Sequence, residues 1–315
     1  MRIGLIDCDK KNNKHIFPNL SLMKISQWHK QQGDKVEWYE PLFGGEYDKV
    51  YVSKVFSFSP NYLYPINAKE VIYGGSGFAI KLVNGVEVYD KELDKPLPYE
   101  IEHIYPDYSI YGITDTAYGF LSRGCPRGCH FCHIKKMQGL ISHKVADLKE
   151  FWNGQKEIVL LDPNITACKD WKDLFQQLID SKAKVDFSQG LDIRMMTEEK
   201  AQMLKQMKIK LIHFAWDKYT DKKMIIPKFE MFKKITNIRD RDLVVYVLCN
   251  FDTTFEEDLE RVYTLRDLGY SPYITLYDKE HIPKGHNLLR LQRWVNNRFI
   301  FWSCNTFEEY MQKEK

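Results

Sequence analysis

The sequence lacks an apolar run of roughly 20 residues, the length needed to cross a membrane, and its first residues, MRIGLIDCDKK, show no cleavage pattern. It also lacks the cysteine pattern of a secreted disulfide framework, because its seven cysteines are odd in number and irregularly spaced. A net charge of +3 is too small to indicate a nucleic-acid partner by itself. We therefore expect a cytoplasmic protein with no membrane partner.

The segment LSRGCPRGCHFCHI places Cys125, Cys129 and Cys132 at C-x-x-x-C-x-x-C spacing. A four-iron cluster takes one thiolate per iron, so three cysteines leave one iron open to another ligand. Gly124 and Gly128 suit a tight loop around a metal core, where side chains would collide with it. The segment predicts a [4Fe–4S] cluster-binding loop.

This run, including the aromatic Phe131 before the last cysteine, resembles the cluster loop of the radical S-adenosylmethionine (radical SAM) enzymes. The resemblance implies that S-adenosylmethionine chelates the fourth iron and is cleaved reductively to a 5′-deoxyadenosyl radical, which modifies a substrate. It also implies an electron donor such as flavodoxin or ferredoxin, and contact between the backbone at Phe131 and the adenine. The segment RGCPRGCHFC is most similar to the branch of this family with an N-terminal cobalamin-binding-type domain and to the methylthiotransferases.

A zinc site is the alternative reading of the same segment. The three cysteines with His130 or His133 would make a Cys₃His set, which is common in intracellular proteins. Structural zinc usually draws on two ligand pairs separated by a longer knuckle, whereas all these ligands fall within nine residues. A zinc-stabilised nucleic-acid-binding protein remains the alternative from another functional class.

The first block, 1–84, has the strand and helix pattern of a small Rossmann-like domain. Short Val-, Ile- and Tyr-rich runs predict strands at 2–9, 35–40, 49–56 and 70–74. A helix is predicted between the first two strands, with Pro18 at its first position and Gly33 at its end. Strands with short connections favour a parallel sheet.

This block also resembles the cobalamin-binding domain, in a degenerate form. In that family the first strand leads into D-x-H-x-x-G, but here Asp7 is followed by a run in which His15 is the first imidazole. Gly74, Gly75 and Gly77 in YGGSGF are similar to the glycine turn that faces the nucleotide tail of the cofactor. Cobalamin is therefore disfavoured as a cofactor, and a cobalamin-dependent radical SAM methyltransferase is the alternative function.

Residues 85–112, rich in Pro and Asp, are predicted to be a linker to a second block, 113–285. Strands are expected at 117–123, 157–161, 184–188, 209–216, 242–249 and 272–277, with room for one helix in each interval. Thr197 and Thr254 mark two helix starts. The alternation predicts a parallel sheet with ligands at its carboxyl ends, and the resemblance implies a partial (β/α)₆ TIM-like barrel.

Polar and aromatic residues follow these strands. The candidate cofactor-binding residues are Phe131, Asp162, Asn164, Ser188, Gln189, Arg194, Trp216 and Asn250. Asp162 and Asn164 occupy the position where family members hold the methionine amine of S-adenosylmethionine, although G-G-E is absent. Arg194 is suited to a carboxylate because its donors lie in one plane. Purely structural roles stay open as alternatives to cofactor binding: residues 162–164 could form a turn that ends a strand, and Asp192 and Arg194 could form an ion pair.

The tail, 286–315, contains RLQRWVNNRFIFWSC, a basic and aromatic mixture that could contact nucleic acid. However, Leu288, Leu291 and Val295 fall on one helical face, and 299–302 is predicted to be a strand. We therefore expect the tail to pack against the open edge of the barrel. The substrate cannot be read from the sequence.

Overall fold

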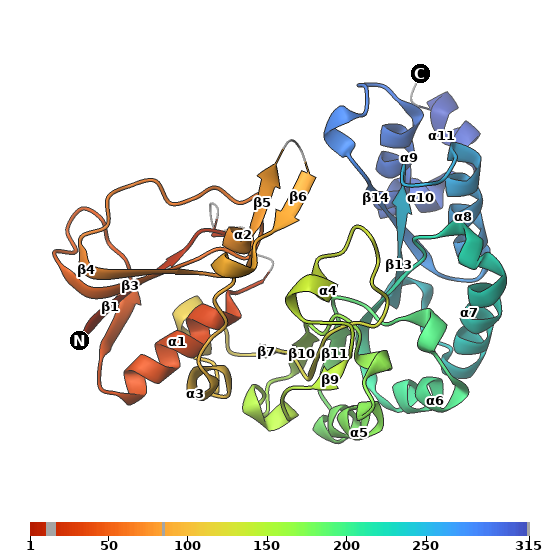
Figure 1. Ribbon diagram of the computed structural model, residues 1–315. Helices are drawn as coiled ribbons and strands as arrows, with labels where there is room; N and C mark the ends of the chain where they lie inside the picture. Colours follow the sequence, from red (N-terminus) through yellow and green to blue (C-terminus); the bar gives the residue numbers. More distant parts are fainter. Residues whose placement is uncertain (11–16, 84–85, 314–315) are drawn as a thin grey trace. The chain divides into compact units, whose positions relative to one another are not determined.

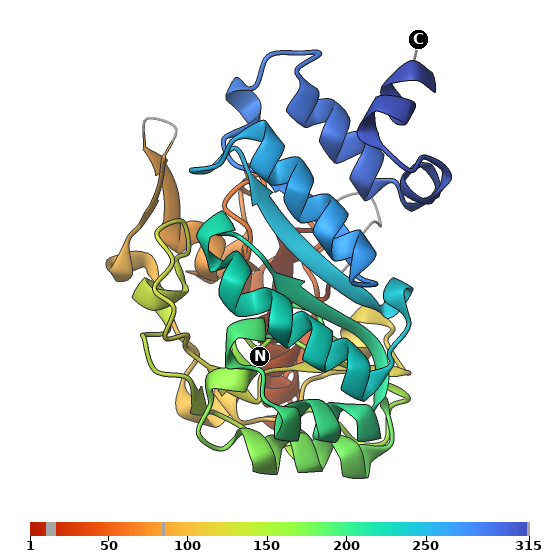
Figure 2. The ribbon, with the colours of Figure 1, turned by 90° about the vertical axis from the view of Figure 1, so that its right-hand side faces the viewer.

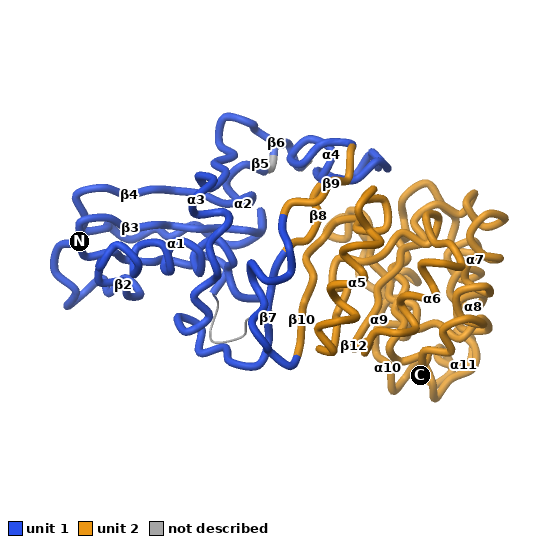
Figure 3. The backbone as a smooth tube through the Cα atoms, turned by 90° about the horizontal axis from the view of Figure 1, so that it is seen from below, with its two compact units in different colours: residues 1–119, 124–140, 146–156 blue, residues 120–123, 141–145, 157–315 orange. Residues whose placement is uncertain are grey.

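The computed structural model describes residues 1–10, 17–83 and 86–313. The chain forms two compact units, which Figure 3 distinguishes by colour. Unit 1 comprises 1–119, 124–140 and 146–156, and unit 2 comprises 120–123, 141–145 and 157–315. The chain thus passes between the units several times around the cysteine segment, so this division differs from the predicted domain boundaries.

The described residues of unit 1 form a four-stranded parallel sheet in the order β2-β1-β3-β4. The strands are β1 (Arg2–Asp7), β2 (Lys35–Trp38), β3 (Tyr47–Ser53) and β4 (Ala68–Gly74). All four runs expected from the sequence are strands, and the Rossmann-like parallel sheet is confirmed.

Helix α1, Leu20–Gln31, connects β1 to β2. The Asn19 side chain accepts a hydrogen bond from the Leu22 N–H at 3.1 Å and so caps the helix. The expectation that Pro18 is the first helical residue is wrong, because this cap places the start two residues later. Gly33, at φ +79°, follows the helix in the predicted left-handed conformation.

Both faces of the first sheet are covered (Figure 1). On one face Ile3 and Leu5 pack with Leu22 and Ile25 of α1. On the other face the buried residues are Ile6, Cys8, Tyr47, Val50 and Val52, against which partly buried side chains such as Tyr62 and Ile66 pack. The sheet is therefore buried on both sides, as parallel sheets require.

The predicted linker is part of unit 1. It contains the hairpin β5 (Ile80–Val83) and β6 (Val86–Tyr89), then helix α3 (Tyr99–Glu102) and a 3₁₀ turn at Tyr108–Tyr111. The Tyr111 hydroxyl donates to Asp7 at 2.6 Å, and the Ser26 hydroxyl donates to Asp107 at 2.6 Å. These contacts fix the segment against the first sheet and helix α1.

The described part of unit 2 contains a parallel sheet in the order β14-β13-β12-β11-β10, with helices between successive strands. The strands are β10 (Glu157–Leu160), β11 (Lys184–Phe187), β12 (Lys208–Ala215), β13 (Leu243–Cys249) and β14 (Ser271–Leu276). The helices are α5 (Trp171–Ser181), α6 (Glu198–Gln206), α7 (Lys222–Thr236) and α8 (Phe255–Asp267). Figure 2 shows the helices lying over one face of the sheet. Thr197 and Thr254 cap α6 and α8 as predicted.

The strand predicted at 117–123 is instead two short strands. β7 spans Thr116–Gly119, and β8 spans Ser122–Arg123. β8 pairs antiparallel with β9, His143–Lys144. The two residues between β7 and β8, Phe120 and Leu121, interrupt the extended run that the sequence suggested.

A β-bulge on β12 decides which side chains face the helices. Val185 of β11 is opposite Ile209, but Asp186 is opposite Leu211, so Lys210 is the extra residue. Because side chains alternate along a strand, one extra residue exchanges the two faces. After the bulge Phe214 packs on Phe229 and Phe232 of α7, and His213 lies on the face away from the helices.

The tail forms α9 (Asn287–Asn296), α10 (Arg298–Ser303) and α11 (Phe307–Lys313). The expectation of a strand at 299–302 is wrong: these residues are helical, because the Asn297 side chain accepts from the Ile300 N–H and starts α10. Helix α9 packs on the edge strand β14 with Leu288, Leu291 and Val295 buried, as expected.

The contact between α9 and β14 is partly polar. The Asn296 side chain accepts from the Ile274 N–H at 2.7 Å and donates to the Ile274 carbonyl at 2.9 Å, and Gln292 donates to the same carbonyl at 3.1 Å. Pro272, two residues earlier on this edge, has no N–H.

None of the described helices is both long enough and apolar enough to cross a membrane.

Candidate functional site

The cysteine segment is a compact loop between β8 and helix α4, Ile134–Met137. Cys125, Cys129 and Cys132 are all partly exposed on this loop. Gly124 (φ +87°) and Gly128 (φ +56°) adopt left-handed conformations, which favour glycine. The loop geometry therefore explains both glycines and presents three thiols within eight residues.

Backbone and side-chain hydrogen bonds close the loop. The Cys132 N–H donates to the Cys129 carbonyl at 3.1 Å, and the Cys125 N–H donates to the Gly139 carbonyl at 3.2 Å. The Gly124 N–H donates to the Gln138 side-chain oxygen at 3.2 Å. The segment after α4 thus returns to the first cysteine and holds the loop at its base.

The two histidines beside the cysteines differ in their surroundings. His130 is exposed, whereas His133 Nε2 lies 3.0 Å from a carboxylate oxygen of Glu87 on β6. Glu87 also accepts from the Ser57 hydroxyl. Across the described residues, no group of three or more His, Cys, Asp and Glu side chains has the arrangement of a metal site. Phe131, next to Cys132, is partly buried in the same loop.

Asp162 fixes the strand that leads into this loop. It is 3% exposed and accepts from the Leu121 N–H at 3.0 Å, from the Ser122 N–H, and from the Ser122 hydroxyl at 2.6 Å. Burial raises the pKa of Asp162 to about 6, while the hydrogen bonds from Ser122 and Leu121 act in the opposite direction. Both oxygens are thus engaged by the segment that precedes the first cysteine.

A polar network joins the carboxyl ends of β10, β11 and β12. The Asn164 amide donates to Asp192 at 3.3 Å, and the Thr166 hydroxyl donates to the Asn164 side-chain oxygen at 2.7 Å. The Asp192 N–H in turn donates to the Thr166 hydroxyl at 3.2 Å. Arg194 donates through Nε to Asp192 at 2.8 Å and through a terminal nitrogen to Asp221 at 3.2 Å. The structure brings the predicted Asn164 and Arg194 together, and it includes the Asp192–Arg194 ion pair.

Two carboxylates of this region, Asp217 and Asp221, are not among the residues predicted from the sequence to bind a cofactor. Asp221, in the 3₁₀ turn Tyr219–Asp221, is the second partner of Arg194. Burial raises the pKa of Asp217, and the guanidinium groups of Arg194 and Arg261 act against that rise. The position of Asp217 after a predicted strand was the available signal, but nothing local in the sequence links Asp221 to Arg194.

Four other predicted residues form no hydrogen bond to this network among the described residues: Ser188, Gln189, Trp216 and Asn250. The Ser188 N–H donates to the Leu160 carbonyl at 3.2 Å, and Gln189 is exposed. Trp216 is 1% exposed and donates from its indole to the Lys218 carbonyl at 2.9 Å, a burial that argues against direct contact with a ligand. Asn250, at φ +65°, donates to the Tyr277 carbonyl at 3.0 Å.

Arg261, which the sequence analysis missed, holds two strand ends in place. This buried side chain on α8 donates to the Trp216 carbonyl at 2.6 Å and to the Leu248 carbonyl at 2.9 Å. It also pairs with Asp258, which accepts from the Thr253 hydroxyl. A buried arginine bound to carbonyls at the ends of β12 and β13 fixes the edge at which ligands bind in such sheets.

In unit 1 the glycine turn has a packing explanation. A Cβ on Gly75 (φ +99°) would lie 2.3 Å from the Lys54 carbonyl oxygen, and one on Gly77 would lie 2.7 Å from the Phe56 carbonyl oxygen. These glycines are required by the approach of their own chain to the end of β3. His15 lies outside the described residues.

No family model matches the chain, and no curated protein matches its sequence. A solved structure of the radical S-adenosylmethionine methyltransferase TsrM from Kitasatospora setae, with cobalamin and a [4Fe–4S] cluster bound, has a similar fold, with a TM-score of 0.58. The similarity covers 87% of this chain and 74% of TsrM, at 11% sequence identity. It confirms the predicted fold class: this chain has a mixed α/β fold in which a Rossmann-like parallel sheet precedes a TIM-like parallel sheet of the kind found in TsrM.

Proposed function

We propose that the protein is a radical SAM enzyme, which binds a [4Fe–4S] cluster through Cys125, Cys129 and Cys132 and cleaves S-adenosylmethionine reductively. The observation that carries the proposal is the loop itself: three partly exposed thiols on one short segment whose turns are made by left-handed glycines. The fold similarity to TsrM supports the same class of enzyme.

The residues present fit such a cluster by their chemistry. Three thiolates are the ligand set that leaves one iron open, and the remaining cysteines, Cys8, Cys168, Cys249 and Cys304, are buried elsewhere. When bound, the cluster and S-adenosylmethionine would supply a 5′-deoxyadenosyl radical for hydrogen abstraction from the substrate. The electron would come from a donor protein such as flavodoxin or ferredoxin.

The chain's own residues would position these groups. Asp162 holds Leu121 and Ser122, four and three residues before the first cysteine, and so sets where the loop begins. The Asn164–Asp192–Arg194 network fixes the adjoining strand ends. We propose a positioning role for this network, because the Arg194 guanidinium is already bound by two carboxylates.

Iron content tests the ligand assignment. Replacing Cys125, Cys129 or Cys132 by Ala should abolish stable cluster binding after anaerobic reconstitution, because each thiolate is one iron bond. Cys168→Ala and Cys249→Ala are the matched controls, since both thiols are buried away from the loop, and should retain iron. Equal iron loss in all five variants would refute the assignment. A colourless protein containing zinc would favour the zinc-stabilised alternative.

Formation of 5′-deoxyadenosine tests the activity. The reconstituted protein, reduced with dithionite, should convert S-adenosylmethionine to 5′-deoxyadenosine and methionine without added cobalamin. Mass spectrometry of the anaerobic reaction, with co-purified material as substrate, would identify the group that is modified.

A cobalamin-dependent radical SAM methyltransferase is the second candidate. The observation in its favour is that TsrM was solved with cobalamin bound and that the similarity extends over 87% of this chain. The packing explanation of Gly75 and Gly77, and the missing D-x-H-x-x-G motif, weigh against it. Equilibrium dialysis separates the two: stoichiometric retention of cobalamin would favour the methyltransferase.

A further inference from the structure

Four polar or aromatic side chains form a row across the helix-free face of the unit 2 sheet, outside the network described above. Asp186 lies on β11, His213 on β12, Tyr246 on β13 and Tyr273 on β14. The His213 and Tyr246 rings are stacked at 5.1 Å and 6°, and Tyr246 meets Tyr273 edge-on at 5.7 Å. Neighbouring strands thus contribute one residue each to a continuous surface.

The bulge at Lys210 creates this row. Without the extra residue, the alternation that places Ile209 toward the helices would also place His213 toward them. With it, Ile212 and Phe214 are buried beneath the helices, and His213 joins Asp186 on the other face. Bulges often re-aim side chains at functional sites.

His213 presents a hydrogen-bond acceptor. Its Nδ1 lies 3.1 Å from the Phe187 carbonyl oxygen, and a carbonyl only accepts, so Nδ1 carries the proton. Burial lowers the pKa of His213, which keeps the ring neutral near pH 7. Nε2 of the neutral ring is then an acceptor with a free lone pair.

Asp186 presents a second acceptor. Its Oδ1 atom is buried and has no hydrogen-bond partner among the described residues. Burial raises the pKa of Asp186, while His213 and Lys210 act against that rise. A buried carboxylate oxygen without a donor costs free energy, so a donor supplied by a ligand would stabilise this site.

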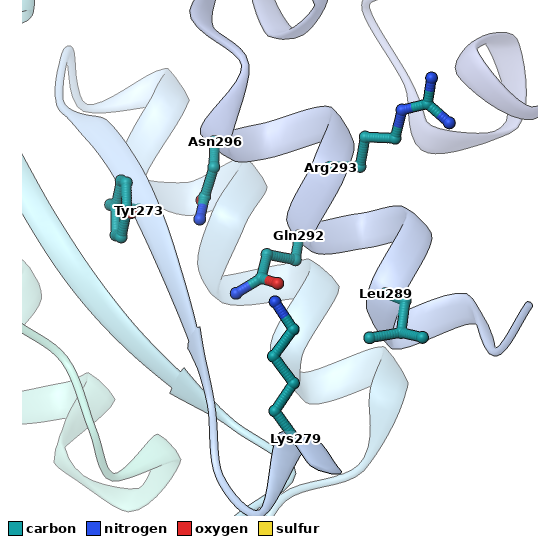
Figure 4. A pocket seen from close by; sticks show the side chains of 6 residues that line it. All are labelled: Tyr273, Lys279, Leu289, Gln292, Arg293 and Asn296. Carbon is teal, nitrogen blue, oxygen red and sulfur yellow. The ribbon is translucent and has the colours of Figure 1, made fainter. Parts of the chain in front are cut away.

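Tyr273 connects the row to a groove at the edge of the sheet. The groove has a volume of about 450 Å³, within the range of small-molecule sites. It is lined by Tyr273, Lys279, Leu289, Gln292, Arg293 and Asn296. Figure 4 shows the Lys279 and Gln292 side chains pointing toward each other and Arg293 pointing away from them. Tyr273 thus belongs both to the row and to the lining of the groove.

We propose that the row Asp186, His213, Tyr246 and Tyr273 is a substrate subsite for a planar group with two neighbouring N–H donors, such as an amidine or an amino-substituted nitrogen heterocycle. Asp186 Oδ1 and His213 Nε2 accept from the two donors, and the tyrosine rings contact the planar group. The subsite rests on the proposed function, since it would hold part of the molecule that the radical attacks.

Benzamidine, a planar amidine, is the probe. Calorimetric titration of the protein should show saturable binding of benzamidine and none of benzoate, which has the same shape but no N–H donor. Asp186→Asn should weaken benzamidine binding at least tenfold, and His213→Phe, which keeps the stack on Tyr246, should weaken it at least threefold. Glu157→Gln is the matched control. It removes one negative charge from the same sheet, where Glu157 pairs with Lys210, and should change the affinity less than twofold.

Benzoate binding as tight as benzamidine binding, unchanged affinity in both Asp186→Asn and His213→Phe, or no saturable binding at millimolar benzamidine would overturn the subsite. Iron content of the same preparations is measured separately. A protein that binds iron but not benzamidine retains the proposed function and loses the subsite, whereas one that binds benzamidine but no iron loses the proposed function.

Discussion

Asp162→Asn is a direct test of how the strand before the cysteine loop is held. The carboxylate is 3% exposed and receives hydrogen bonds from Leu121 and Ser122. The amide of asparagine keeps one acceptor oxygen but turns an N–H₂ group toward donors. The substitution therefore removes both the buried charge and part of its hydrogen bonding.

The pH dependence separates these two effects. An ordinary aspartate has a pKa of 3.8, and burial raises that of Asp162 to about 6. Below about pH 4 the carboxyl is neutral in the folded and unfolded states, so its burial carries no charge penalty. As the pH rises through about 6 the ionised form disfavours folding, and the free energy of unfolding falls by about 3 kcal/mol.

The measurement is urea unfolding of cluster-free protein at a series of pH values. The free energy of unfolding of the wild type, minus that of Asp162→Asn, should fall by about 3 kcal/mol between roughly pH 4 and pH 7. Asp173→Asn, on the exposed face of α5, is the control and should give a far flatter difference. If the Asp162→Asn difference is flat, the donated hydrogen bonds balance burial, and if it rises with pH they outweigh burial; either result refutes the reasoning.

Two further substitutions each test a contact within one unit, Arg194→Lys in unit 2 and Gly75→Ala in unit 1. Arg194→Lys should lower the free energy of unfolding by about 1–2 kcal/mol, since lysine cannot bind Asp192 and Asp221 with one planar fork. The same substitution should change S-adenosylmethionine affinity less than twofold. A tenfold loss of affinity would instead assign Arg194 to cofactor binding. Gly75→Ala should destabilise the protein by about 3 kcal/mol or more, measured by urea unfolding, because its Cβ would lie 2.3 Å from the Lys54 carbonyl oxygen at φ +99°. Gly74→Ala has nothing within 4 Å of its Cβ and should have a much smaller effect. Equal losses in the two glycine variants would contradict the packing explanation.

Local signals predicted the elements that depend on local chemistry. Thr197 and Thr254 cap helices because their hydroxyls reach N–H groups three residues on, which the sequence spacing already indicates. The parallel strands were predictable because buried β-strands are rich in Val and Ile. The apolar run at 299–302 was misassigned, since four apolar residues fit a short helix as well as a strand.

The arrangement of the site depended on distant contacts. In the sequence KIKLIHFA the alternation of polar and apolar residues breaks at Leu211 and Ile212, a trace of the bulge, but only the pairing with β11 shows that His213 joins Asp186. Asp221 meets Arg194 across 27 positions, and Arg261 reaches Trp216 across 45, so neither contact has a sequence signature. The loop that carries the three cysteines was predictable because all three lie within one short segment of the sequence.

The side chain of Asn296 also covers part of the exposed backbone edge of β14. An exposed edge strand is a template onto which another chain can add a strand, which is a common route to aggregation. At β14 the Ile274 N–H and carbonyl are already bound by Asn296, and Pro272 has no N–H to offer. The sheet of unit 2 can therefore stay unclosed without joining a second molecule edge to edge through these positions.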